Sequence, residues 1–119
     1  MIYTPAILIG HFVADFVCQP RSWADTKHKD VTSLIYHVSV YMVVMAIALG
    51  VVMVAKIPLT LVVLWALING IMHFATDFVT SKLFHKNWEA GRRATAINIY
   101  GLDQLIHYLC LFGTLGIMP

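Results

Sequence analysis

Two six-residue stretches of the chain are nearly identical: residues 11–16 read HFVADF and residues 73–78 read HFATDF. Each stretch places a histidine four residues before an aspartate, within sequence that is otherwise apolar. Side chains four residues apart lie on the same face of an α-helix. Each stretch therefore predicts an apolar helix that presents one His/Asp pair.

The composition around these stretches is typical of a membrane protein. Of the 119 residues, 60% are hydrophobic and 12% are charged, whereas soluble domains carry about 25% charged residues. The apolar residues fall in long blocks, and a block that crosses lipid must be helical because its backbone polar groups can be satisfied only within the segment. We therefore predict an all-α integral membrane protein with one domain, residues 1–119, formed by four transmembrane helices in an antiparallel bundle. The predicted helices cover about residues 2–19, 32–55, 58–84 and 96–117.

The basic residues are concentrated in two of the three predicted loops. The first loop holds Arg21, Lys27 and Lys29, and the third also holds three basic residues, whereas the second contains Lys56 alone. Lysine and arginine are enriched in cytoplasmic loops. We therefore expect the first and third loops in the cytoplasm and both termini outside. The chain has no basic stripe with interleaved aromatic residues, so we expect no binding to nucleic acid.

The ionisable residues inside the predicted spans lie at one depth. At 1.5 Å per residue, the aspartates and the histidine of the second helix lie roughly 6–12 Å from the cytoplasmic ends of their helices, and the other histidines lie one turn deeper. Charged groups within a membrane normally face the interior of the bundle. We therefore predict one polar cluster at the centre of the bundle, open toward the cytoplasm. Its members are His11, Asp15, His37, His73, Asp77, Asp103 and His107.

These side chains suit a divalent metal ion. Imidazole and carboxylate groups are ligands for zinc, manganese and iron, and helical bundles bind metals through such pairs on facing helices. We predict that all seven residues are metal ligands for one or two ions, with zinc or manganese as the cofactor. A bound metal lowers the pKa of a water molecule to about 7 and so supplies hydroxide. Asp15, Asp77 and Asp103 are the candidate catalytic residues.

Four polar residues near the cytoplasmic opening are candidates for substrate binding. Lys82 follows Asp77 by five residues and is expected to reach a phosphate. Gln19 and Gln104 are expected to orient the ligands, and Lys27 is the fourth candidate. Each has a simpler interpretation, as a topology signal or as a polar cap at the membrane interface.

The similarity of the two stretches extends to a weak repeat of the helical hairpins. The stretches are 62 residues apart, and the first and third helices run in the same direction, so the halves would be parallel repeats. His37 then corresponds to Ile99, or to Asp103 if four extra residues are allowed in the longer half. The bundle is thus expected to contain two related hairpins that face one another across the cluster.

The order of these motifs resembles a known family. HFVADFVCQ, His37, HFATDFVTSK and DQLIH follow one another as in the domain of unknown function 3307 family, small multi-pass membrane proteins of bacteria and phages. This resemblance implies the bacterial inner membrane and no particular activity. The pattern is also distantly similar to that of membrane-bound metal-dependent hydrolases and zinc-dependent phospholipase C. That second resemblance implies metal ligation by His11, Asp15, His73, Asp77, Asp103 and His107.

Three functions remain open on this evidence. The first is a metal-dependent hydrolase that acts on a phosphoester of a lipid or lipid-linked substrate, because the cluster is expected near the headgroups. The second is an ion or proton transport or relay protein, which would be a homo-oligomer because four helices enclose only a narrow path. The third is a non-catalytic membrane interaction protein, in which His–Asp hydrogen bonds hold the bundle together.

Overall fold

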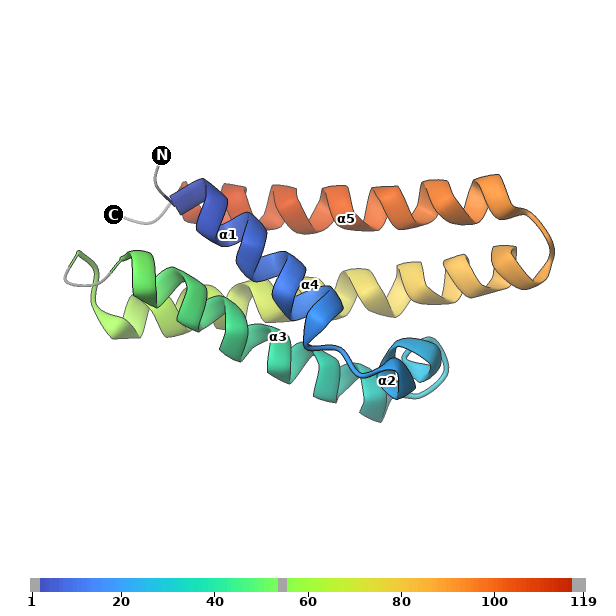
Figure 1. Ribbon diagram of the computed structural model, residues 1–119, viewed down its shortest axis with the longest axis horizontal. Helices are drawn as coiled ribbons and strands as arrows, with labels where there is room; N and C mark the ends of the chain where they lie inside the picture. Colours follow the sequence, from blue (N-terminus) through green and yellow to red (C-terminus); the bar gives the residue numbers. More distant parts are fainter. Residues whose placement is uncertain (1–2, 54–55, 117–119) are drawn as a thin grey trace.

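The computed structural model describes residues 3–53 and 56–116, and every regular element within them is a helix. Along the chain these are α1 (Tyr3–Phe12), the π-helical turn η1 (Val13–Val17), α2 (Arg21–Thr26), α3 (Val31–Val52), α4 (Leu59–Glu89) and α5 (Arg93–Leu115) (Figure 1). The described part of the chain contains no strand, which confirms the prediction of an all-helical fold.

Three long helices form the body of the molecule. α4 packs against α3 on one side and α5 on the other, and consecutive long helices run in opposite directions (Figure 1). α1 crosses over α3 and runs in the same general direction as α4, and α2 lies at the beginning of α3. We call the end of the bundle that carries α2 and the α4–α5 connection the α2 end. α1 begins and α5 ends at the opposite end of the bundle (Figure 1).

The helix boundaries differ from the predicted ones, and three differences matter most; α3 also ends three residues earlier, at Val52, and α5 begins three residues earlier, at Arg93. The first helix is α-helical only to Phe12, and α4 continues five residues beyond Phe84 to Glu89. Hydropathy marks where a segment leaves lipid, and a helix can continue into polar sequence until it meets a stop. For α4 that stop is Gly91, whose φ of 74° is left-handed and favours glycine. The predicted first loop contains α2, which the sequence analysis missed.

A side-chain cap fixes the beginning of α3. The Asp30 carboxylate accepts hydrogen bonds from the backbone N–H groups of Thr32 (3.0 Å) and Ser33 (3.2 Å). These bonds, together with one from the Ser33 hydroxyl, hold the pKa of Asp30 below its ordinary value. The cap places His37 two turns into the helix, on the buried face.

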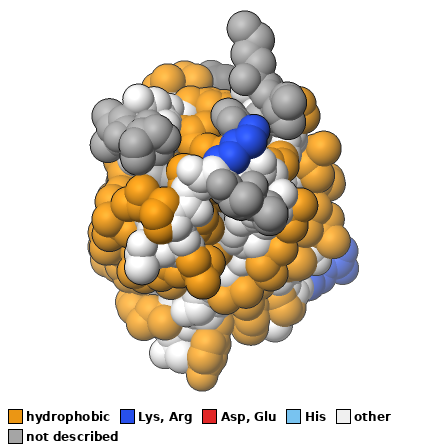
Figure 2. Space-filling view, turned by 90° about the vertical axis from the view of Figure 1, so that its left-hand side faces the viewer, with side chains coloured by type: hydrophobic (Ala, Val, Ile, Leu, Met, Phe, Trp, Pro, Cys, Tyr) orange, Lys and Arg blue, Asp and Glu red, His pale blue; other side chains and the backbone are white. Residues whose placement is uncertain are grey.

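The buried face of the long helices is not their most apolar face. On α4 the buried positions recur every three or four residues, and the stripe includes Asn69, His73, Asp77 and Thr80. Large apolar side chains cover much of the outside instead, as the end-on view of the surface shows (Figure 2). α3 and α4 are each long and apolar enough to cross a membrane, and residues 4–17 form a shorter apolar segment. The buried polar side chains thus share the interior with an apolar core, while many large apolar side chains face outward.

Close contact between α1 and α3 depends on Gly10. A Cβ atom at this position would lie 2.7 Å from the Cβ of Ala48 and 3.5 Å from the Sδ of Met45. The Ala48 Cβ cannot move without its backbone, so a larger residue at position 10 would push the helices apart. Small residues allow such close packing of membrane helices. The next residue, His11, is fully buried.

We expect Gly10→Ala to lower the free energy of unfolding by about 1–3 kcal/mol, because the added methyl group overpacks the α1–α3 contact. Gly113→Ala is the matched control, because nothing lies within 4 Å of the position that its Cβ would take. That substitution should stabilise the helix by about 0.5–1 kcal/mol. Denaturant unfolding in detergent micelles measures both, and equal effects would contradict the close contact.

Candidate metal centre

The structure brings together all seven ionisable residues that the sequence analysis assigned to one cluster. None of them is more than 7% exposed. They come from every element except α2. They meet in the interior of the bundle, between α1 and η1 on one side and the three long helices on the other. The members of the cluster are His11, Asp15, His37, His73, Asp77, Asp103 and His107.

Four of these residues surround a single point, and we call them the tetrad: Asp15, His37, His73 and Asp77. The His37 and His73 Nε2 atoms are 2.9 Å apart. Asp15 Oδ1 lies 3.1 and 3.6 Å from these two nitrogens, and Asp77 Oδ2 lies 3.5 and 3.6 Å from them. The four residues offer ligand atoms that all lie within 4.8 Å of one another.

These distances fit a tetrahedral metal site. For ligands at about 2.0 Å from a zinc ion, the edges of a tetrahedron are about 3.3 Å long. Five of the six tetrad edges, at 2.9–3.6 Å, surround that value, and the ligand atoms of Asp15 and Asp77 lie within 4.8 Å of one another. Two imidazoles and two carboxylates are also a donor set that zinc, manganese and iron accept. The tetrad could therefore hold a divalent ion without rearrangement of the backbone.

The two copies of the repeated motif contribute differently to the tetrad. In α4 both His73 and Asp77 belong to it, and the backbone there is regular α-helix. In the first copy only Asp15 belongs to it, and it lies in η1, where the N–H of Cys18 bonds the carbonyl of Val13. Such π-helical turns are frequent at functional sites.

His11 lies beside the tetrad and is held by other groups. Its Nε2 donates to the Oε1 of Gln104 at 3.1 Å, so its Nδ1 accepts from the hydroxyl of Tyr41 at 3.2 Å. The Gln104 amide in turn donates to Oδ2 of Asp15 (3.0 Å) and Oδ2 of Asp103 (3.1 Å). Gln104 thus orients the carboxylates, as the sequence analysis expected, and His11 orients Gln104.

The sequence analysis missed two residues that also touch the cluster. The Thr80 hydroxyl donates to Oδ1 of Asp103, and the Tyr41 hydroxyl bonds His11. Thr80 lies three residues after Asp77, and Tyr41 lies four after His37. The same helical spacing that revealed the His/Asp pairs would have found both residues.

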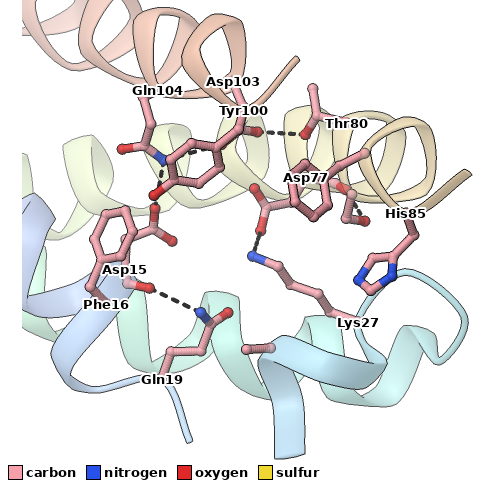
Figure 3. Close-up of a pocket in the computed structure, with 13 residues that line it drawn as sticks. Asp15, Phe16, Gln19, Lys27, Asp77, Thr80, His85, Tyr100, Asp103 and Gln104 are labelled. Atoms are coloured by element: carbon pink, nitrogen blue, oxygen red, sulfur yellow. Dashed lines mark hydrogen bonds and ion pairs between the residues drawn. The ribbon is translucent and has the colours of Figure 1, made fainter. Parts of the chain in front are cut away.

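A pocket of about 190 Å³ leads to the cluster from the α2 end. Its lining includes the carboxylates of Asp15, Asp77 and Asp103 (Figure 3). It also includes three aromatic residues, in which the Tyr100 ring lies 6.2 Å from that of Phe16 and 6.3 Å from that of Phe84. Of the predicted substrate-binding residues, Gln19, Lys27 and Gln104 all line this pocket.

Lys27 reaches from α2 into the pocket and contacts the tetrad (Figure 3). Its Nζ lies 2.7 Å from Oδ2 of Asp77, and its side chain is 17% exposed. Burial would lower the pKa of Lys27, but the neighbouring carboxylates of Asp77 and Asp15 outweigh this effect and raise the pKa above its ordinary value. Lys27 therefore keeps a positive charge beside a candidate metal ligand.

Lys82 does not reach the cluster. Its Nζ lies 3.4 Å from the centroid of the Phe78 ring, and Lys82 is absent from the lining of the pocket. Five residues correspond to about 140° around a helix, so Lys82 points away from the face that carries Asp77. Its predicted contact with a substrate phosphate stays a prediction. Ser81, four residues after Asp77, lines the pocket in its place.

Comparison with known proteins identifies one family. A family model with the description "Protein of unknown function (DUF3307)" matches residues 4–116, which is nearly the whole chain. The match confirms the resemblance inferred from the order of the motifs. No curated protein and no solved structure matches the chain, so a similarity to hydrolases is not shown.

We expect Lys27→Met to tighten the binding of Mn²⁺ by about tenfold to a hundredfold. The ammonium group competes with a metal ion for Oδ2 of Asp77, and a hydrogen bond to a charged group contributes about 1.5–3 kcal/mol. Because the pKa of Lys27 is raised, the ion pair is complete below the ordinary value of 10.5 and is lost only as the pH rises through the higher folded-state value. The difference in Mn²⁺ affinity between Lys27→Met and the wild type should therefore be constant from about pH 7 to about pH 9.

Titration calorimetry of the detergent-solubilised protein measures this affinity. The matched control is Lys29→Met, which removes the same charge from an exposed position two residues away. An equal gain in affinity for both variants would show that net charge, and not the contact with Asp77, determines the effect.

Proposed function

This chain belongs to the DUF3307 family of proteins of unknown function, and we propose that it is a metal-dependent hydrolase of the bacterial inner membrane that cleaves phosphoesters of lipid-linked substrates. The observation that carries the proposal is the tetrad, a near-tetrahedral set of two histidines and two aspartates beside a pocket that also holds a lysine. Separate features support the location in the membrane, the hydrolytic chemistry and the lipid-linked substrate.

The outward-facing apolar side chains support a bundle that is embedded in lipid. Large apolar residues are exposed on every long helix, for example Val43 on α3, Ile71 on α4 and Leu105 on α5. Soluble monomers rarely expose contiguous apolar patches of more than a few hundred Å². The 23 residues of α5 extend about 34 Å, enough to cross the hydrocarbon core, and its Asp103 and His107 face inward. We therefore propose four spans, with the basic loops in the cytoplasm and both termini outside.

The residues of the tetrad would hold a zinc or manganese ion. Such an ion, when bound, lowers the pKa of a coordinated water to about 7. Asp15 and Asp77 serve as catalytic residues by binding the ion, and Gln104 fixes the orientation of Asp15. The Lys27 ammonium, already in the pocket, is placed to donate to an oxygen of a substrate phosphate.

The pocket favours an amphiphilic substrate. Its lining combines three carboxylates and Lys27 with the aromatic rings of Phe16, Phe84 and Tyr100. Its volume of about 190 Å³ is small beside the roughly 300–1,000 Å³ of typical ligand pockets. A phosphate headgroup would fit against the cluster while the alkyl part of the molecule remains in the bilayer.

The transport alternative finds less support in the arrangement of the core. Beyond the cluster, away from the α2 end, buried apolar side chains fill the bundle, including those of Met45, Leu49, Trp65 and Leu111. An ion or proton path across the membrane would have to pass through this apolar layer. The cluster instead opens through a pocket at one end.

Several buried polar atoms of the cluster lack hydrogen-bond partners, and this weakens the non-catalytic alternative. Oδ1 of Asp15, Nδ1 of His73 and both ring nitrogens of His107 are buried without a hydrogen-bond partner in the described part of the protein. Buried polar groups that serve only to hold a structure together are nearly always hydrogen-bonded. His107, with neither ring nitrogen paired, is therefore better explained as a ligand than as a structural link.

We expect the purified protein to hydrolyse phospholipids in mixed micelles only when Mn²⁺ or Zn²⁺ is present, and to lose this activity on treatment with a chelator. Substitution of outer-shell residues typically reduces activity 10- to 100-fold, so loss of a ligand in His73→Gln should reduce kcat/KM by about a hundredfold or more. Release of soluble headgroup or phosphate measures the reaction, with p-nitrophenyl phosphate as a soluble comparison.

His28→Gln is the matched control for this experiment. His28 lies outside the cluster and stacks on His85, with 3.6 Å between the ring centroids, so its loss should leave metal dependence unchanged. Metal binding without turnover of any phosphoester tested would contradict the hydrolase, and absence of bound metal would contradict the centre itself.

We expect cysteines at opposite ends of the bundle to react from opposite sides of the membrane. In a background of Cys18→Ser and Cys110→Ser, Glu89→Cys should react with an impermeant maleimide only from the cytoplasmic side, and Lys56→Cys only from the outside. Labelling of intact cells and of inverted vesicles measures this. Reaction of both positions from the same side would contradict the four-span topology.

A further inference from the structure

Asp77 has its two carboxylate oxygens directed to different sets of histidines. Oδ2 faces the tetrad, at 3.5 Å from His37 and 3.6 Å from His73. Oδ1 faces away from those residues and lies 3.6 Å from Nε2 of His107. A carboxylate placed in this way has the arrangement of a bridging ligand, which binds one metal ion through each oxygen.

A second group of donors lies on the Oδ1 side of Asp77. Asp77, Asp103 and His107 offer ligand atoms within 4.8 Å of one another, and all three residues are buried. His107 and Asp103 are four residues apart on α5, with Nδ1 of His107 3.5 Å from Oδ2 of Asp103. Oδ2 of Asp15 also points away from the tetrad, toward His11 and Gln104.

His107 provides an independent sign of a ligand in this second group. Its side chain is 2% exposed, and both of its ring nitrogens lack a hydrogen-bond partner. Neither nearby carboxylate, at 3.5 and 3.6 Å, is in hydrogen-bond geometry with it. A buried imidazole with two unpaired nitrogens, aimed at carboxylates on both sides, is costly in a folded protein unless something else binds it.

We propose that the cluster is a two-metal centre, in which one divalent ion occupies the tetrad and a second is bound by Asp103, His107 and Oδ1 of Asp77, with Asp77 as the bridge. This inference rests on the proposed metal-dependent function. It adds that the centre holds two ions and that the Asp77 carboxylate connects them. In two-metal hydrolytic sites the ions are about 3.5–4 Å apart, a distance that a bridging carboxylate sets.

The balance of charge links the second ion to the kind of substrate. The cluster contains three carboxylates and one contacting cation, Lys27. A single divalent ion would neutralise these groups, and a second would leave two positive charges at the bottom of the pocket. That excess would attract a dianion such as a phosphate monoester, whose oxygens can bind both ions. The two-metal centre therefore favours phosphate monoesters over neutral esters.

The test uses Mn²⁺ with the full-length protein in detergent. At saturation we expect two Mn²⁺ per chain by elemental analysis and an electron paramagnetic resonance spectrum broadened by spin coupling between bridged ions. His107→Gln and, independently, Asp103→Asn should each bind one Mn²⁺ per chain and give an uncoupled six-line spectrum. His28→Gln, which removes a histidine outside the cluster, should keep two coupled ions.

One Mn²⁺ per chain in the saturated wild type would overturn the two-metal centre, and so would two ions without spin coupling. Retention of two coupled ions in both His107→Gln and Asp103→Asn would overturn the assigned ligands. The wild-type measurement does not depend on the folding of any variant. One ion with hydrolysis would leave the proposed function intact, whereas two coupled ions without hydrolysis would contradict that function and support the centre.

Discussion

Three aspartates buried in an apolar bundle are the constraint on which the rest of the structure depends. Removal of a carboxylate from water costs several kcal/mol unless a partner or a metal compensates it. In the described part of the chain, Lys27 is the lysine that contacts one of these carboxylates, that of Asp77. Four histidines lie among the three carboxylates, and Gln104 bonds Asp15 and Asp103. The arrangement of helices, the short α2 and the pocket can all be understood as consequences of this buried charge.

α2 illustrates how a surface element serves the buried cluster. The ring of Trp23 stacks on that of Tyr36 with 5.8 Å between their centroids, which docks α2 against the outside of α3. This contact sets the position of Lys27 one turn later, so that its side chain enters the pocket and reaches Asp77. A flexible loop would lose more side-chain and backbone entropy to hold the same ion pair. The helix therefore reduces the cost of placing a cation beside the tetrad.

The sequence predicted the members of the cluster because their positions follow from helix geometry alone. Spacing of four residues puts His73 and Asp77 on one face, and the expense of intramembrane charge directs that face inward. The path of a loop has no such periodicity, so nothing in the sequence placed Lys27 against Asp77. Lys82 lies outside the pocket because its position five residues after Asp77 puts it on another face of α4.

The π-helical turn could not be predicted from the repeated motif itself, because nearly the same six residues form a regular α-helix in α4. What differs is the sequence that follows. Pro20 lacks an N–H group, so the first helix cannot continue past it, whereas the sequence after Phe78 continues the helix to Glu89. The conformation of the motif thus depends on where its helix must end. That information lies outside the six residues, so a comparison of the two motifs alone cannot supply it.

The separation between helices sets the geometry of the tetrad, and glycines lie at two of the close contacts that accompany it. The tetrad draws its ligands from η1, α3 and α4, so edges near 3 Å require these elements to approach closely. Gly10 brings α1 against Ala48 of α3, and at Gly70 a Cβ would clash with Met42 of α3. Each glycine lies within three residues of a cluster histidine, His11 or His73. Because productive sites tolerate displacements of only about 0.5 Å, a larger residue at Gly10, whose neighbour is the fixed Cβ of Ala48, would disturb the ligands together with the packing. Stability and metal binding are therefore coupled through the same helix contacts.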